Sequence, residues 1–188
     1  MFLDIGVGIL IAVGVSSWFH IALSPTVIFA SIIFALLPDV DFWVEFFKHK
    51  SVGGTVIREH RELFHFPLVF IPLTELVWFF AGSFWATLFG LGIFAHFLHD
   101  SIPTLGWGIK WFWPFSRKSY KLFAGENGRW APRLYIAWTP EELEKTAALY
   151  GDPDWIKNFY LHITPTLITE LLVLFIAMIA LVLYTRGV

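Results

Sequence analysis

Long apolar segments constrain the fold of this chain more than any other feature of its sequence. Hydrophobic residues make up 57% of its 188 residues and charged residues only 15%, whereas about 25% of a soluble domain is charged. Because a helix needs about 20 apolar residues to cross a bilayer, this composition predicts an all-α membrane protein, a polytopic helical bundle with about five transmembrane helices. The five apolar segments cover residues 5–23, 27–37, 64–81, 84–99 and 165–184.

The second segment is too short to cross a bilayer as a straight helix. It would span only about 17 Å at 1.5 Å per residue, and Pro38 is predicted to end it because proline cannot continue helical hydrogen bonding. It can tilt, extend past Pro25 with a kink, or form a hairpin with the first segment that does not cross. Four spans are therefore the alternative to five, and in either case we expect residues 1–188 to form a single membrane-embedded domain.

The stretch between the fourth and fifth segments, residues 101–163, is predicted to lie outside the membrane or at its surface. Residues 107–118 mix tryptophan with lysine and arginine, a composition typical of the headgroup layer. Further along the chain, Thr139 and Glu142 have the spacing of a capping box, which predicts the start of a short helix. We expect that helix to end near Gly151.

Positive charge is concentrated on one side of the predicted bundle. With five spans, the N-terminus, residues 39–63 and residues 101–163 share one side, which holds all 13 Lys and Arg residues except Arg186. Cytoplasmic loops of membrane proteins carry the excess of Lys and Arg, so we expect this side to face the cytoplasm. A bundle of four spans would place the N-terminus on the other side.

Three short polar clusters interrupt the apolar sequence, each near the end of an apolar segment. In the five-span topology they lie at one depth on the cytoplasmic side, although they are far apart in the sequence. Ionisable residues at membrane depth are costly and are usually functional, so the clusters are predicted to converge in a metal site. Its candidate ligands are Asp39 and Asp41, His60 and His65, and His96, His99 and Asp100.

The spacing within the clusters is compatible with metal ligation. His96 lies three residues before His99 and four before Asp100, so all three side chains can share one helical face. Asp39 and Asp41 are expected in an extended or turn segment, where one can bind a metal while the other supports it.

His60 and His65 are five residues apart, which is more than one helical turn. Both therefore reach one site only if a helix begins between or near them. Arg61 lies beside His60 and either binds a phosphate or carboxylate through two hydrogen bonds or anchors the chain at the cytoplasmic surface. Asp41 and Arg61 are the predicted catalytic residues. One carboxylate of the site would act as general base, and Arg61, with Lys110 or with residues 117–118, would neutralise phosphate charge.

The types of ligand restrict the metal. The chain has no cysteine, which excludes thiolate sites, and mixed histidine and carboxylate ligands suit zinc, manganese or iron, as one ion or as a two-metal centre. We expect zinc. Bound divalent metals promote hydrolysis as Lewis acids. The alternative is that the histidines are polar tips in the headgroup layer and the aspartates only mark helix ends.

Two further ionisable residues fall within or near the apolar segments. With five spans, His20 lies near the opposite face from Asp39, and it would join the site only if the first two segments form a shallow hairpin. Glu75 lies in the middle of the third segment. It is expected to pair with a neighbouring helix, to line a polar path or to stay neutral within the bundle.

The polar clusters resemble the signature blocks of the YdjM-like family of inner-membrane-associated metal-dependent hydrolases. The sequence PDVD at residues 38–41 resembles the PDID block of that family, HRELFH at 60–65 matches its HRxxTHS block in spacing, and HFLHD at 96–100 matches its HxxxD block. Thr104, Gly106 and the sequence WPF at 113–115 resemble its trailing TxxG and PF elements. The resemblance covers residues 38–116, and Phe64 and Phe66 stand where the family has Thr and Ser.

This resemblance implies an inner-membrane protein with a divalent metal and hydrolase activity. His99 is not at a signature position and stays a candidate on its spacing alone. In the family, the hydroxyl groups at positions 64 and 66 could orient ligands or substrate, and the two phenylalanines of this chain lack them. By motif position, the resemblance gives metal-site roles to Asp39, Asp41, His60, His65, His96 and Asp100.

Together these features predict a membrane-embedded, metal-dependent hydrolase that cleaves a phosphoester of a lipid or membrane-near substrate at the cytoplasmic face. The preference for a lipid rests on residues 107–118. The expected partners are membrane lipids, among them a phosphorylated lipid substrate, and no nucleic acid is expected because no basic reading helix is present. The alternative is a non-enzymatic membrane protein, either a metal or proton carrier or a scaffold with a structural metal site.

Overall fold

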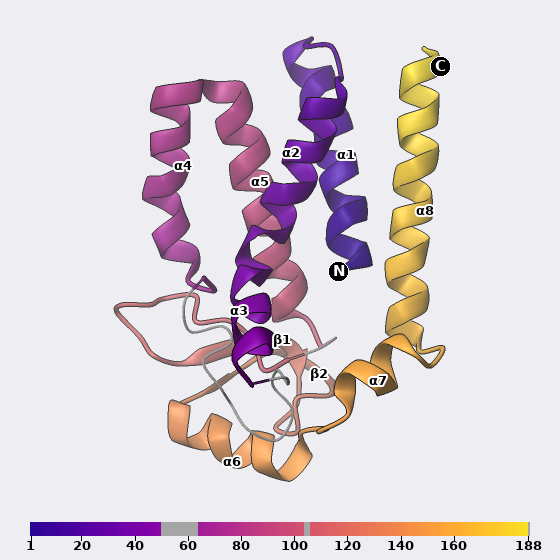
Figure 1. Ribbon diagram of the computed structural model, residues 1–188. Coiled ribbons are helices and arrows are strands. Elements are labelled where there is room, and N and C mark those ends of the chain that lie inside the picture. Colours follow the sequence, from indigo (N-terminus) through magenta and orange to yellow (C-terminus); the bar gives the residue numbers. More distant parts are fainter. Residues whose placement is uncertain (50–63, 104–105, 188) are drawn as a thin grey trace. The chain divides into compact units, whose positions relative to one another are not determined.

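The computed structural model of the chain is mostly helical (Figure 1). It describes residues 1–49, 64–103 and 106–187. Its helices and strands are α1 (Phe2–Phe19), α2 (Pro25–Leu36), the 3-10 turn η1 (Leu37–Asp39), α3 (Val40–His49), α4 (Pro67–Ala81), α5 (Ser83–Ser101), β1 (Ser119–Ala124), β2 (Trp130–Trp138), α6 (Pro140–Tyr150), α7 (Trp155–Tyr160) and α8 (Pro165–Arg186). Two compact units can be distinguished, one formed by Met1–Leu37, Val69–His96 and Ile163–Val188, the other by Pro38–Leu68 and Phe97–His162.

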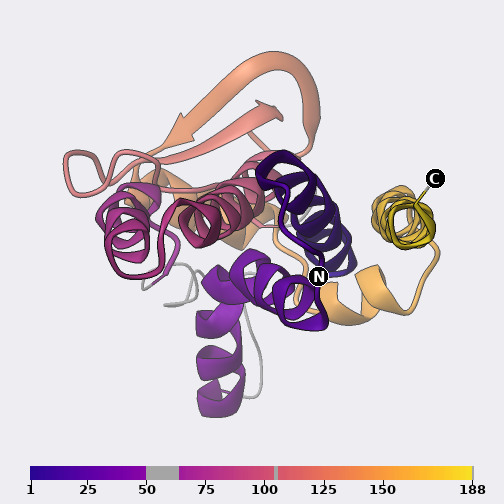
Figure 2. The ribbon, with the colours of Figure 1, turned by 90° about the horizontal axis from the view of Figure 1, so that it is seen from above.

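In the first unit, α1 packs closely against both α2 and α8 (Figure 2). Two glycines make this close approach possible. A Cβ atom at Gly6 would lie 2.9 Å from the Cα of Leu174 in α8, and one at Gly8 would lie 2.8 Å from the Cα of Ile32 in α2. Small residues at such interfaces let membrane helices pack backbone to backbone. The buried hydroxyl of Ser31 also donates a hydrogen bond of 2.8 Å to the Gly8 carbonyl.

Three helical stretches of the described residues are long and apolar enough to cross a membrane. They are Phe2–Phe19, Pro25–Lys48 and Pro165–Arg186, and α4 is also apolar but shorter. Large hydrophobic side chains such as Phe79 and Phe175 are exposed on these helices, as expected for a surface that faces lipid rather than water. The prediction of a mostly helical membrane protein is confirmed, and the number of five spans stays a prediction.

The second apolar segment does not stop at Pro38. The turn η1 follows α2 and leads directly into α3, so that the helical stretch from Pro25 reaches Lys48. Proline is tolerated here because its fixed φ suits the first turn of a helix, where its missing N–H group is not needed. Asp39 and Asp41 consequently lie in η1 and in the first turn of α3. Of the predicted extended or turn backbone, the turn holds for Asp39, whereas Asp41 is helical.

In the first unit, α4 leads into α5 through a tight turn at Gly82. This glycine has a φ of 86°, a value that residues with a Cβ rarely adopt. Its N–H group donates to the Trp78 carbonyl at 3.0 Å, which closes the last turn of α4. Helix α5 then begins at Ser83 and carries His96 and Asp100 close to its C-terminal end.

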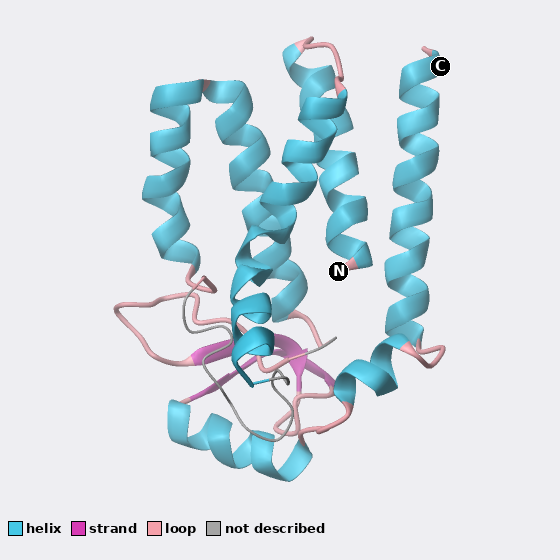
Figure 3. Ribbon diagram, viewed as in Figure 1, coloured by secondary structure: helices cyan, strands magenta, loops and turns pink. Residues whose placement is uncertain are grey.

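The second unit contains a two-stranded antiparallel sheet, which corrects the all-α expectation (Figure 3). Strands β1 and β2 pair with Ser119 opposite Trp138. The dipeptide Asn127-Gly128 between them is a strong hairpin signal, and burial alternates along much of β1, as on a half-buried strand. No strand was predicted between the aromatic and basic residues 107–118 and the helix that follows Thr139.

The predicted capping box at the start of α6 is present. The Thr139 hydroxyl accepts a hydrogen bond from the Glu142 N–H group at 3.3 Å, and the Glu142 carboxylate accepts one from the Thr139 N–H group at 2.8 Å. Backbone hydrogen bonding at this helix start, aided by the Thr139 side chain, lowers the pKa of Glu141. The helix ends at Tyr150 with Gly151 as its C-cap, as predicted.

Candidate metal centre

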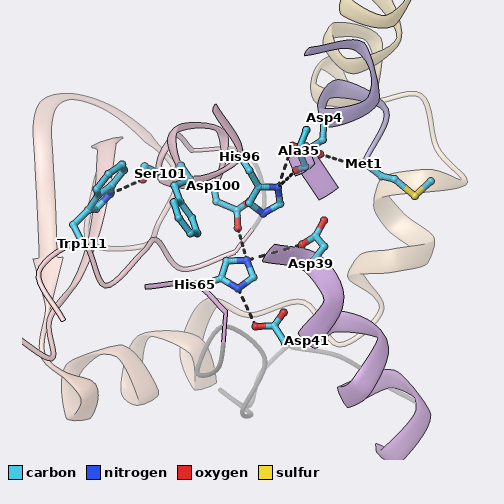
Figure 4. Close-up of polar contacts among 11 residues, drawn as sticks. Met1, Asp4, Ala35, Asp39, Asp41, His65, His96, Asp100, Ser101 and Trp111 are labelled. Atoms are coloured by element: carbon cyan, nitrogen blue, oxygen red, sulfur yellow. Dashed lines mark hydrogen bonds and ion pairs between the residues drawn. The ribbon is translucent and has the colours of Figure 1, made fainter. Parts of the chain in front are cut away.

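His65 lies at the centre of a buried cluster of three aspartates (Figure 4). Its side chain is fully buried, at 0% exposure. Its Nδ1 atom lies 2.9 Å from Oδ2 of Asp41, and its Nε2 atom lies 3.4 Å from Oδ2 of Asp100 and 4.0 Å from Oδ1 of Asp39. The three polar stretches of the sequence thus each contribute to one cluster.

The local backbone explains how these side chains come together. Asp39 ends the turn η1 and Asp41 stands in the first turn of α3, while Asp100 is in the last turn of α5. His65 precedes α4, which begins at Pro67. Phe66, the residue before this proline, is disfavoured in helical conformation, which favours a helix start at Pro67 and leaves His65 outside the helix.

The contacts of His65 indicate which of its two ring nitrogens carries the proton. An ionised Asp41 only accepts hydrogen bonds, so Nδ1 carries a proton and donates it to Asp41. In a neutral ring Nε2 then has a lone pair, and it faces the carboxylates of Asp39 and Asp100. A proton or a metal cation at this position removes the repulsion between electron-rich atoms. A carboxylate that fixes the other ring nitrogen is the usual support of a metal-binding histidine.

His96 lies one turn before Asp100 on α5 and is buried. Its Nδ1 atom lies 2.9 Å from the Ala35 carbonyl oxygen and 3.3 Å from Oδ1 of Asp4. The carbonyl oxygen can only accept, so Nδ1 donates and Nε2 is the atom that can bind a metal. The two histidines therefore have the same arrangement, with Nδ1 held by an oxygen acceptor and Nε2 available as a ligand atom.

Among its described residues, the second unit offers ligand atoms for a metal ion. Oδ2 of Asp100 and Oδ1 of Asp39 lie 3.4 Å and 4.0 Å from Nε2 of His65. Imidazole nitrogen with carboxylate oxygen is a donor set that suits zinc, manganese or iron. In the cluster around His65, three carboxylates meet one imidazole, so a divalent cation would offset their charge. These residues fit a divalent metal.

The predicted ligands have different outcomes. Asp39, Asp41, His65 and Asp100 are brought together around one imidazole. His99 is half-buried on α5, and the roles of His96 and His99 as metal ligands stay predictions. The predicted residues outside the described part of the chain are His60 and Arg61.

The two ionisable residues left open by the sequence are exposed on helices of the first unit. His20 is exposed at the C-terminal end of α1, about 24 Å from Asp4 along the helix axis at 1.5 Å per residue. Since Asp4 contacts His96, His20 lies at the other end of α1 from that contact. Glu75 is exposed in the middle of α4.

Asp4 is a site residue that the sequence reasoning missed. Only 2% of its surface is exposed, and it contacts His96. Glu170 is similarly buried and accepts a hydrogen bond of 3.0 Å from the Phe2 N–H group. The signal was available, because a carboxylate inside an apolar segment is costly and needs a partner.

Replacing Asp4 with asparagine is expected to weaken the binding of Co²⁺ about 10-fold. Loss of a residue that holds a metal ligand in place typically lowers metal affinity about 10- to 100-fold, and this change is expected at the lower end of that range. The amide cannot hold the His96 ring through a charged acceptor, although it preserves the shape of the side chain. Titration of the purified protein with Co²⁺, followed by its visible absorption, measures the change. Glu144→Gln removes an exposed carboxylate of α6 and serves as the control. Equal affinities of the two variants would contradict the role of Asp4.

Comparison with known proteins agrees with the predicted family. The model of a protein family described as YdjM inner membrane protein matches residues 4–187. The chain is also 34% identical over 135 residues to the inner membrane protein YbcI of Escherichia coli strain K12, and the aligned part covers 68% of this chain and 70% of that protein. No solved structure matches the chain. The resemblance of the sequence motifs to this family is thereby confirmed.

Proposed function

We propose that this chain, which belongs to the YdjM family of inner membrane proteins, is a membrane-embedded, metal-dependent hydrolase. Its substrate is a phosphoester of a lipid or of another membrane-near molecule. The observation that carries the proposal is the buried cluster in which His65 directs Nε2 at Asp39 and Asp100 while Asp41 holds Nδ1. Such a cluster is costly in a protein interior unless a proton or cation offsets its charge.

The exposure of the cluster favours a catalytic over a structural site. The side chain of Asp39 is 33% exposed, whereas His65, Asp41 and Asp100 are buried. Structural metal sites are closed by protein ligands, and catalytic sites keep a position open to water and substrate. The edge of the cluster at Asp39 supplies that opening.

The proposed ligands are Asp39, His65, His96 and Asp100. They would bind one or two divalent ions, for which zinc is the first choice and manganese or iron the alternatives. When bound, such a cation supplies Lewis acidity that polarises a phosphoryl oxygen. Asp41 keeps the His65 ring in one orientation and one tautomer through its contact with Nδ1. The geometry therefore supports a positioning role for this predicted catalytic residue. Proton acceptance by one of the carboxylates completes the proposed hydrolysis.

The membrane setting supports a lipid substrate. Phe115, Arg117 and Lys118 are exposed in one short segment of the second unit, and such residues suit lipid headgroups and phosphates. Arg61 keeps its predicted role of neutralising phosphate charge. We further propose five spans, with α4 and α5 as the two additional ones. The site would then face the cytoplasm, because the positive residues lie on that side.

Hydrolysis by the purified full-length chain tests this proposal. The protein, reconstituted in nanodiscs and supplied with Zn²⁺, Mn²⁺ or Fe²⁺, is given phosphatidic acid or soluble p-nitrophenyl phosphate. We expect metal-dependent release of phosphate from the lipid that stops when a chelator is added. Release from the soluble ester alone would contradict the lipid preference. Bound metal without any hydrolysis of either compound would favour the non-enzymatic alternative.

A further inference from the structure

We propose that Trp111 and Trp113 are positioning residues of the candidate metal centre. They act on the backbone segments that carry Asp100 and His65, so that the two ligands keep their mutual distance. The inference rests on the proposed metal centre and deepens it. Every contact that supports it lies within the second unit, among the described residues 64–68, 97–103 and 106–120.

Trp111 holds the end of helix α5. Its indole N–H group donates a hydrogen bond of 2.8 Å to the hydroxyl of Ser101, which in turn donates to the Phe97 carbonyl at 2.7 Å. Ser101 is fully buried and directly follows Asp100. The Trp111 ring also meets the Phe97 ring edge to face at 6.3 Å, and the Phe97 ring contacts the His65 ring at 6.2 Å. Trp111 thus reaches both ligands through one intermediate residue.

Trp113 holds the segment before helix α4. Its ring stacks on the ring of Phe66 with a centroid distance of 4.5 Å and an angle of 16° between planes. Phe66 is buried and directly follows His65. Offset stacked aromatic pairs contribute about 0.5–1.5 kcal/mol beyond their buried area. The stack therefore restrains the backbone next to His65, just as Trp111 restrains the backbone next to Asp100.

The two tryptophans are themselves fixed to the strand pair. Ile109 exchanges two backbone hydrogen bonds with Tyr120, of 3.0 and 2.8 Å. Gly108 is required for this approach, because it has a φ of 82° and a Cβ atom there would lie 2.3 Å from the Tyr120 carbonyl oxygen. These contacts attach the start of the segment from Ile109 to Trp113 to strand β1.

The orientation of the aromatic residues in this segment supports a division of roles. Phe112 and Phe115 are exposed, Phe115 at 88%. Trp111 and Trp113 are partly buried and contact Phe97 and Phe66. The exposed residues suit the headgroup layer, whereas the two tryptophans face the segments that carry the ligands. Displacement of a ligand by about 1 Å is enough to impair a preorganised site.

Titration with Co²⁺ tests the inference without any substrate. The full-length chain and its variants are purified in detergent, and the visible absorption of Co²⁺ is followed as a function of metal concentration. Trp111→Phe removes the N–H donor and keeps a ring, and Trp113→Leu removes the stacking. We expect each to lower the affinity about 10-fold and to shift the absorption bands, as loss of a supporting residue does in metal sites. Trp113→Phe preserves stacking and is expected to restore most of the affinity.

Trp107→Phe is the matched control. Trp107 belongs to the same segment but packs against Trp138 of β2, with ring centroids 6.4 Å apart, and so should leave the Co²⁺ affinity unchanged. An equal loss in this control would show general destabilisation and overturn the inference. Wild-type affinity in both Trp111→Phe and Trp113→Leu would overturn it while leaving the metal centre intact. If Trp113→Leu does not fold, Trp111→Phe decides alone. A wild-type chain that binds no Co²⁺ would overturn the metal centre and the inference together.

Discussion

Replacing His65 with glutamine is expected to reduce the affinity for Zn²⁺ or Mn²⁺ by more than about 100-fold. This loss of affinity is larger than that caused by replacing a residue that only supports a ligand. His65 is the imidazole around which Asp39, Asp41 and Asp100 gather, and glutamine keeps much of its size without the ligand nitrogen. A ligand at 100 times its Kd stabilises a folded protein by about 2.7 kcal/mol. The metal-dependent rise in Tm expected of the wild type should therefore be lost in the variant.

The control for this variant is His162→Gln, which changes an exposed histidine of the same unit. It should leave both the affinity and the metal-dependent rise in Tm unchanged. Isothermal titration calorimetry and thermal unfolding with and without metal measure the two quantities. If His65→Gln binds metal as tightly as the wild type, His65 is not a ligand.

Replacing Asp39 with asparagine is expected to reduce kcat about 100-fold or more, because a lost charged ligand forfeits several kcal/mol of transition-state stabilisation. Asp39 is the partly exposed member of the cluster, so its replacement should change the Tm of the metal-free protein little. Hydrolysis of phosphatidic acid in nanodiscs and thermal unfolding are measured on the same preparations. A catalytic site is expected to lose turnover and keep its fold.

The matched variant for Asp39→Asn is Glu144→Gln, which also neutralises an exposed carboxylate of the second unit. It should keep both turnover and Tm. A structural metal site would behave in the opposite way, since loss of metal would then lower the Tm. A large fall in Tm for Asp39→Asn, with turnover of the remaining folded protein unchanged, would contradict the catalytic assignment.

The apolar segments and the polar clusters could be predicted from the sequence because each depends on local pattern. A run of apolar residues indicates a membrane helix whatever packs against it, and a capping box such as that at Thr139 is complete within four residues. The convergence of Asp39, His65 and Asp100 followed from placing segment ends on one side of a membrane. Its prediction needed only the direction of each helix, and the contacts of His65 agree with it.

Features that depend on tertiary contacts were not predictable in the same way. Asp4 lies far from His96 in the sequence, so the contact between the two residues requires the packing of helices. The roles of Trp111 and Trp113 depend on which side of one segment faces Phe97 and Phe66, and composition gives no such direction. The distinct tasks of Asp39 and Asp41 likewise depend on the 3-10 turn at Pro38, which orients two neighbouring carboxylates toward different nitrogens of one ring.

The metal content of the purified full-length chain tests the central claim most directly. The protein is prepared without chelators, and its zinc, manganese and iron are quantified by mass spectrometry alongside the His65→Gln variant. We expect about one or about two divalent ions per wild-type chain, as in mononuclear and two-metal centres, and a loss of that metal in the variant. Less than about a tenth of an equivalent in the wild type, or equal metal in both proteins, would contradict a metal centre at His65.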